Sequence, residues 1–206
     1  RRTARSPGIM NQMIEKGFRI ERRGGRELAD ILSEFKDYRV VANIRNPYHR
    51  VLSSYLDKLN RYTRAFDRPV FYYGKMRQFL EGPASWKNNH RSMHHMQSRI
   101  SFEALVDGLA RHGVAFDNHF NLQVELLSLG RVEYDALFHL ENLQEELLAG
   151  LRKFGVGDEF IGRLSEIPRK NTSKYNKSRD AFLTPPVREK IYDIYRRDFE
   201  ALGYTR

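Results

Sequence analysis

Residues 44–53 (IRNPYHRVLS) contain two arginines and a serine at a spacing that suits anion binding. At about 100° per residue, a helix over this segment places Arg50 and Ser53 on one polar face, and Arg45 lies just before it. A guanidinium grips phosphate through paired donors, and a hydroxyl adds a further donor. The segment therefore predicts an anion site at Arg45 and Ser53, with Arg50 as a third candidate. A merely solvated helix face is the alternative.

The flanking elements would place this site at the edge of a sheet. Residues 38–44 (YRVVANI) are β-branched and mostly apolar, which predicts a short buried strand that ends next to Arg45. Asn46 is a good helix cap and Pro47 suits the first helical position, so a helix is predicted from Pro47 to about Asn60. The N–H groups at a helix start favour anions. In open α/β sheets, ligands bind at the carboxyl ends of the strands.

The rest of the chain predicts a helix-rich α/β domain. Ser101 is a candidate N-cap and Gly113 a candidate stop for one helix, while Thr184 and Pro185 begin the last one. Strands separated by helices favour a small parallel sheet flanked by helices. The length favours a single domain over residues 1–206. Besides the helix that begins at Pro47, the predicted helices cover residues 9–17, 26–36, 102–112, 120–129, 141–155 and 185–204, and a second strand is predicted over residues 133–140.

The charge balance favours an anionic partner. The 206 residues include 36 Lys and Arg against 26 Asp and Glu, a net charge of +10. This suits nucleic acid, a phosphorylated cofactor, an acidic glycan or a membrane surface, without choosing among them.

There are no cysteines, which excludes disulfides, thiolate nucleophiles and cysteine-ligated zinc. No apolar run approaches the roughly 20 residues of a membrane span. No metal is expected, because the histidine cluster His90, His94 and His95 lacks a nearby carboxylate.

Four segments resemble a known enzyme family. IRNPYHRVLSSYLDK is similar to the 3′-phosphate-binding segment of sulfotransferases that use 3′-phosphoadenosine-5′-phosphosulfate (PAPS), most of all the carbohydrate sulfotransferase type (sulfotransferase family 2). That pattern is roughly R-[DN]-P-x-x-R-x-x-S-x-Y, and Asn46 stands where Asp is commoner. Three further segments resemble the family in order along the chain: residues 116–123 (FDNHFNLQ), 133–147 (EYDALFHLENLQEEL) and 194–204 (IYRRDFEALGY).

The resemblance implies a P-loop-NTPase-like sulfotransferase fold and a set of site residues. Arg45 and Ser53 would hold the 3′-phosphate of PAPS. The catalytic base would be His119, which lies in a matching segment, or Glu141. His119 only ordering its loop, and Glu141 only favouring a helix start, are the alternatives. A basic loop over residues 168–180 would close over the nucleotide, or would be a flexible surface loop. Its candidate cofactor-binding residues are Lys170, Asn171, Thr172 and Ser173.

One part of the family pattern is not recognisable in this sequence. The family cradles the 5′-phosphosulfate with a loop that follows a strand, carries a Lys and precedes the 3′-phosphate segment. Residues 1–37 contain no such strand and no Lys at the turn. The loop is expected upstream of Arg1, and its loss or a protein without catalysis are the alternatives. No lysine is assigned to the leaving group.

The resemblance implies a sulfotransferase that transfers a sulfuryl group from PAPS to a hydroxyl, with a carbohydrate as the expected acceptor. An acidic acceptor would suit the cations and aromatic rings of residues 61–100, and the alternative is that these residues form a small satellite of the core with a solvated rim. The alternatives are a nucleic-acid or polyanion-binding module, which lacks a recognisable motif here, and a nucleotide-binding relative without catalysis. Animal carbohydrate sulfotransferases are Golgi membrane proteins with cysteines. Because this chain has none, a bacterial cytoplasmic protein is expected, or the Golgi lumen for a eukaryotic one.

Overall fold

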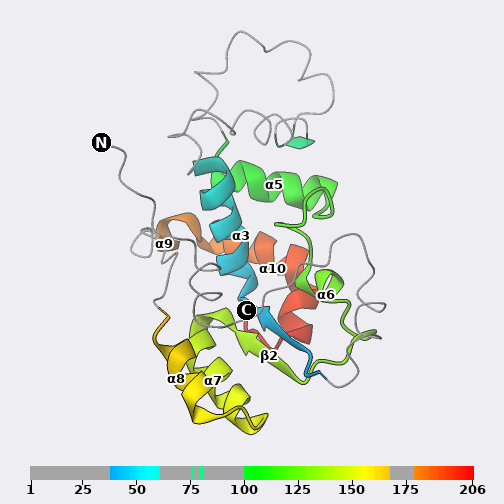
Figure 1. Cartoon of the computed structure of the whole chain (residues 1–206). Coiled ribbons are helices and arrows are strands. Elements are labelled where there is room, and N and C mark those ends of the chain that lie inside the picture. The colour runs from blue at the N-terminus through cyan, green and yellow to red at the C-terminus, as the bar shows by residue number, and fades with distance from the viewer. Residues whose placement is uncertain (1–37, 61–75, 77–78, 81–99, 168–178) are drawn as a thin grey trace, which may run out of the picture. The chain divides into compact units, whose positions relative to one another are not determined.

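The structure is a computed structural model that describes residues 38–60, 76, 79–80, 100–167 and 179–206 (Figure 1). The chain divides into two compact units. The first comprises Arg1–Asn43 and Val132–Lys174, and the second comprises Ile44–Arg131 and Tyr175–Arg206. The expectation of a single domain over residues 1–206 stays a prediction.

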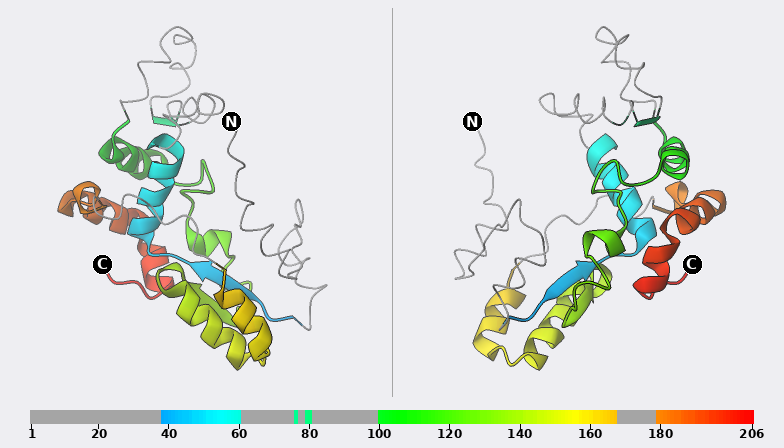
Figure 2. Two further views of the ribbon diagram at one scale, coloured as in Figure 1. Left: turned by 60° about the vertical axis from the view of Figure 1, so that its left-hand side comes forward. Right: turned by 90° about the vertical axis from the view of Figure 1, so that its right-hand side faces the viewer.

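The first unit contains a two-stranded parallel sheet and the helices that follow it. Phe138 of the sheet is buried against helix α7, and a Cβ atom on Gly150 would lie 2.7 Å from its ring, so the glycine allows this close approach. Helix α8 packs along α7 (Figure 2). The elements are β1 (Val41–Ile44), β2 (Ala136–His139), the 3-10 helix η5 (Leu140–Asn142), α7 (Leu143–Lys153) and α8 (Asp158–Ser165).

The carboxylate of Asp135 fixes the start of the strand pairing. Its Oδ2 accepts from the backbone N–H of Val40 at 2.8 Å, and its Oδ1 accepts from Arg39 at 2.9 Å. The backbone N–H of Asp135 donates to the carbonyl of Val40 at 2.8 Å. These contacts lower the pKa of the Asp135 carboxyl. The bond from the Val40 N–H has the largest effect, and the bond from the Arg39 guanidinium comes second. The ionised carboxylate therefore sets the register of β1 against β2.

Changing Asp135 to Asn is expected to lower the melting temperature near neutral pH. A carboxyl whose pKa is depressed by folding adds stability above its unfolded pKa of about 4, and this stability is lost as the pH falls through the folded value. The difference between wild type and Asp135→Asn should therefore shrink as the pH falls below about 4. Thermal unfolding across this range measures it, with Glu145→Gln on α7 as the charge-matched control. A difference that stays constant with pH would contradict the assignment.

The second unit is a helical assembly that carries the candidate site. Helices α3, α5 and α10 pack on one another (Figure 1), and α6 packs on α10. Its elements are α3 (Pro47–Tyr55), the π-helix η1 (Leu56–Asn60), α5 (Phe102–His112), α6 (Gln123–Leu126), α9 (Arg179–Phe182) and α10 (Pro185–Ala201). The core includes Tyr48, Val51, Leu52, Phe102, Leu105, Phe120, Ile191, Tyr195 and Phe199.

The local signals for helix starts are confirmed at two places. Asn46 caps α3, and its side-chain oxygen accepts from the backbone N–H of Tyr48 at 3.0 Å. Ser101 caps α5 through Ala104, and α5 covers the predicted residues. The helix-rich α/β architecture with a small parallel sheet is also as predicted.

Several predicted elements have different bounds. The strands are shorter than predicted, and the helix expected to run to Asn60 becomes a π-helix after Tyr55. The helix expected over residues 120–129 is reduced to α6, because side chains bond the carbonyls of the preceding turn and Ser128 adopts a φ of 50°. Helix α8 was not predicted. The helices expected at residues 9–17 and 26–36 lie outside the described residues.

Candidate active site

The backbone of Arg45 is held at both of its polar groups by Gln123. The Arg45 N–H donates to Gln123 Oε1 at 2.9 Å, and Gln123 Nε2 donates to the Arg45 carbonyl at 2.8 Å. Gln123 is buried, with 6% of its surface exposed. A side-chain amide that pairs with both groups of one residue fixes the direction in which that residue's side chain leaves the backbone. The strand-to-helix turn at Arg45 is therefore preorganised.

Asp198 of α10 holds Gln123 in turn. Its carboxylate oxygens accept from the backbone N–H groups of Gln123 at 2.8 Å and Val124 at 3.0 Å, which satisfies two donors at the start of α6. The side chain is fully buried. Burial raises the pKa of Asp198, and the two N–H donors and the charge of Arg50 oppose that rise. A chain of hydrogen bonds thus runs from α10 through α6 to the backbone of Arg45.

The start of α3 has the features that an anion site needs. Its first turn contains no acidic residue. Ser53 lies two turns from the cap and is partly buried, and its hydroxyl has no hydrogen-bond partner among the described residues. A hydroxyl without a partner on the polar face of this helix is suited to a phosphate oxygen. The assignment of the 3′-phosphate to Arg45 and Ser53 stays a prediction that this geometry fits.

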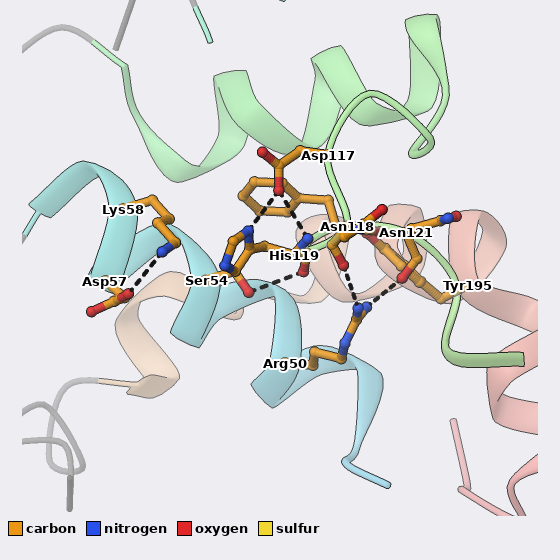
Figure 3. A network of polar contacts seen from close by, with 10 residues as sticks. Arg50, Ser54, Asp57, Lys58, Asp117, Asn118, His119, Asn121 and Tyr195 are labelled. Carbon is orange, nitrogen blue, oxygen red and sulfur yellow. Dashed lines mark hydrogen bonds and ion pairs between the residues drawn. The ribbon is translucent and has the colours of Figure 1, made fainter. Parts of the chain in front are cut away.

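Arg50 points its terminal nitrogens at the protein. Nη1 donates to the carbonyl of Asn121 at 2.6 Å, and Nη2 donates to the carbonyl of Asn118 at 3.0 Å (Figure 3). Burial lowers the pKa of the guanidinium. The sequence analysis placed Arg50 among the cofactor-binding residues. Spacing on a helix face does not show whether a polar side chain binds a cofactor or a neighbouring loop of the protein. The observed contacts favour a structural grip on residues 118–121.

His119 forms a dyad with Asp117. Oδ1 of Asp117 lies 2.6 Å from His119 Nδ1 and also accepts from the His119 backbone N–H at 2.9 Å (Figure 3). This contact assigns the proton of the neutral ring to Nδ1 and leaves the Nε2 lone pair as the acceptor. The histidine side chain is 50% exposed and the aspartate 9%. The geometry is that of an oriented imidazole that can take a proton from a hydroxyl.

The loop that carries this dyad is tied to two helices. The hydroxyl of Ser54 on α3 donates to the carbonyl of His119 at 3.1 Å (Figure 3). The hydroxyl of Tyr195 on α10 donates to the carbonyl of Phe120 at 2.6 Å. Phe120 is fully buried and stacks on Phe116, with ring centroids 5.6 Å apart. The candidate base therefore stands on an anchored turn.

One family model matches almost the whole chain. The model is that of the sulfotransferase family, and it covers residues 10–205. The chain belongs to the sulfotransferase family. The family supports sulfuryl transfer as its chemistry. A search of curated proteins found no match, and a search of solved structures found none either.

Several of the residues that make the contacts described above lie in segments that resemble the sulfotransferase family. Asp117, His119 and Gln123 all belong to the family-like segment at residues 116–123, and each makes a specific contact. Asp198 belongs to the family-like segment at residues 194–204. The pairing of Gln123 with Asp198 was not predicted, although both residues lie in segments that resemble the family. Nothing in the sequence identified Ser54 or Tyr195 as anchors of the loop.

The remaining predicted residues are not among those described in the second unit. Glu141 lies in η5 of the first unit and is exposed, and its role as a base stays a prediction. The residues Lys170, Asn171, Thr172 and Ser173, the histidines at 90, 94 and 95, and residues 1–37 lie outside the described residues. Within the described ranges no group of three potential metal ligands occurs, and no helix is long and apolar enough to cross a membrane.

Proposed function

We propose that this chain transfers a sulfuryl group from PAPS to a hydroxyl group of a carbohydrate acceptor. The observation that carries the proposal is the Asp117–His119 dyad, whose loop is bonded to the helix that starts beside Arg45 and contains Ser53. An oriented base and an anion-binding helix start in one unit are what transfer from a phosphorylated donor to a hydroxyl requires. Family membership supports the reaction class.

Arg45 and Ser53 would hold the 3′-phosphate of the donor. The guanidinium can give paired charge-assisted donors, and the Ser53 hydroxyl can give one more. When bound, PAPS supplies an electron-poor sulfuryl group on a phosphate leaving group. By analogy with phosphoryl transfer, the residues of this chain then mainly position the two substrates and stabilise the charge that develops during transfer.

His119 would act on the acceptor. Its Nε2 would accept the proton of the attacking hydroxyl while Asp117 holds the ring through Nδ1. The exposed position of His119 leaves it open to a bulky acceptor such as a sugar. The resemblance to the carbohydrate type and the net charge of +10 favour a carbohydrate, and an acidic one in particular.

Transfer and binding assays test the proposal. Transfer from PAPS with radioactive sulfur to a panel of neutral and acidic oligosaccharides should give labelled product. The desulfated product nucleotide, 3′-phosphoadenosine-5′-phosphate, should raise the melting temperature, since a ligand of the folded state stabilises it. No shift with this nucleotide, together with a strongly salt-dependent shift with heparin or DNA, would replace the proposal by a polyanion-binding module. Nucleotide binding without transfer to any acceptor would indicate a relative without catalysis.

Changing Arg45 to Ala is expected to abolish most of the nucleotide-induced thermal shift. A lost charge-assisted contact to phosphate costs about 1.5–3 kcal/mol, which is roughly 10- to 150-fold in affinity. The measurement is a titration of the melting temperature against nucleotide concentration. Arg196→Ala is the control, because Arg196 lies exposed on α10, where it contacts Asp193 and the ring of Tyr192 on the same helix. An unchanged affinity in Arg45→Ala would show that the phosphate binds elsewhere.

A further inference from the structure

We propose that Arg50 and Ser54 are positioning residues that hold His119 in place, so that helix α3 sets both the phosphate site and the base. The inference deepens the proposed function and rests on it for the identity of the base. Arg50 acts through the loop and touches neither donor nor acceptor. This differs from the role that its place in the sequence suggested.

The guanidinium of Arg50 spans the turn that contains His119. It donates to the carbonyl of Asn118, the residue before His119, and to that of Asn121, two residues after it, at 3.0 and 2.6 Å. Only a planar fork with two separate donors can bond two carbonyls on either side of one residue in a fixed geometry. A lysine at this position would offer a single point charge.

Ser54 completes the grip one helical turn further along α3. Its hydroxyl donates to the carbonyl of His119 itself at 3.1 Å. With Tyr195 on the carbonyl of Phe120, three side chains bond four consecutive carbonyls, those of residues 118–121. Backbone N–H groups of Phe120 and Asn121 close the same turn onto the carbonyl of Asp117, at 2.9 and 3.1 Å. The turn therefore has its polar groups bound on both sides.

The arrangement fixes the base relative to the phosphate donors. Ser53 and Ser54 are neighbours on α3, so one faces the proposed phosphate site while the other holds the loop of His119. A regular helix keeps these two directions about 100° apart. Anchoring the nucleotide to α3 thus places its reacting end at a set distance from His119, without any contact between Arg50 and the nucleotide.

Arg50→Lys and Ser54→Ala test the positioning role by separating turnover from binding. Displacement of a base by about 1 Å lowers rates by roughly 100-fold, so kcat should fall by about 10- to 100-fold in Arg50→Lys and less in Ser54→Ala. KM for PAPS and the nucleotide-induced thermal shift should stay within about twofold, since the phosphate donors are unchanged. Arg196→Lys and Ser165→Ala are the matched controls, because both residues are exposed.

Nitrogen-15 NMR of the His119 ring gives a readout that does not need turnover. In wild type the Nδ1 proton that bonds Asp117 should mark a single tautomer, and Arg50→Lys should broaden or shift that signal more than Arg196→Lys does. If wild type transfers no sulfuryl group, the proposed function fails while this spectrum still decides the positioning role. Unchanged His119 signals and kcat in Arg50→Lys overturn the inference. So does a lost nucleotide shift with unchanged His119 signals, which would make Arg50 a direct cofactor ligand.

Discussion

Replacing His119 with alanine is expected to lower kcat for sulfuryl transfer by about 10²- to 10⁴-fold, the usual contribution of a positioned base. KM for PAPS should change little, because His119 is held by Asp117 and by the bond from Ser54 and is not one of the proposed phosphate-binding residues. Steady-state kinetics with a fixed oligosaccharide acceptor measure both values. The nucleotide-induced thermal shift should persist, which separates loss of the base from loss of the fold.

Asp117→Asn provides a graded second variant. The amide can still meet the His119 backbone N–H through its oxygen, but it no longer stabilises a positively charged ring. Its kcat should therefore lie between wild type and His119→Ala. His112→Ala is the control for a histidine lost from the surface, because His112 is exposed at the end of α5. Full activity in His119→Ala, with loss in Glu141→Ala, would transfer the role of base to Glu141.

The elements that the sequence predicted well are those specified by neighbouring residues. Asn46 and Pro47 define the start of α3 through contacts within three residues, and Ser101 does the same for α5. The alternation of strands and helices favoured a parallel sheet for the same kind of reason. Local hydrogen bonds and the helical period are visible in a sequence, so these elements could be placed without coordinates.

The hydrogen bonds between distant residues of the candidate site could not be predicted in the same way. Gln123 meets Arg45 across 78 positions of the chain, and Asp198 meets Gln123 across 75. No spacing rule pairs residues so far apart. Arg50 shows the consequence most clearly. Its helical phase assigns it to a polar face, and only the fold shows that two of its N–H donors bind carbonyls of the loop at residues 118–121.

The same long-range hydrogen bonds connect two of the family-like segments to each other. The segment at residues 116–123 supplies the proposed base, His119, and Gln123, which bonds to the backbone of Arg45. The segment at residues 194–204 supplies Tyr195 and Asp198, which fasten that segment to α10. Each depends on the other for its geometry. A change in α10 should therefore affect the proposed phosphate site by lowering stability and by moving the backbone of Arg45.

Asp198→Ala is expected to be the most destabilising of the proposed substitutions, lowering the free energy of unfolding by about 2–4 kcal/mol. It leaves the buried N–H groups of Gln123 and Val124 without their acceptor, and each such loss costs about 1–3 kcal/mol, which relief of the buried charge partly offsets. The melting temperature should fall by roughly 5–15 °C for a chain of this size. Denaturant unfolding followed by circular dichroism measures the change.

Asp193→Ala is the matched control, because it removes a carboxylate from the same helix at an exposed position, where the pair with Arg196 contributes little. At a temperature where Asp198→Ala is still folded, its affinity for 3′-phosphoadenosine-5′-phosphate should also be reduced, since Gln123 no longer holds the Arg45 backbone firmly. Asp193→Ala should keep that affinity. A destabilised Asp198→Ala with wild-type nucleotide affinity would show that the hydrogen-bond chain supports the fold without setting the phosphate site.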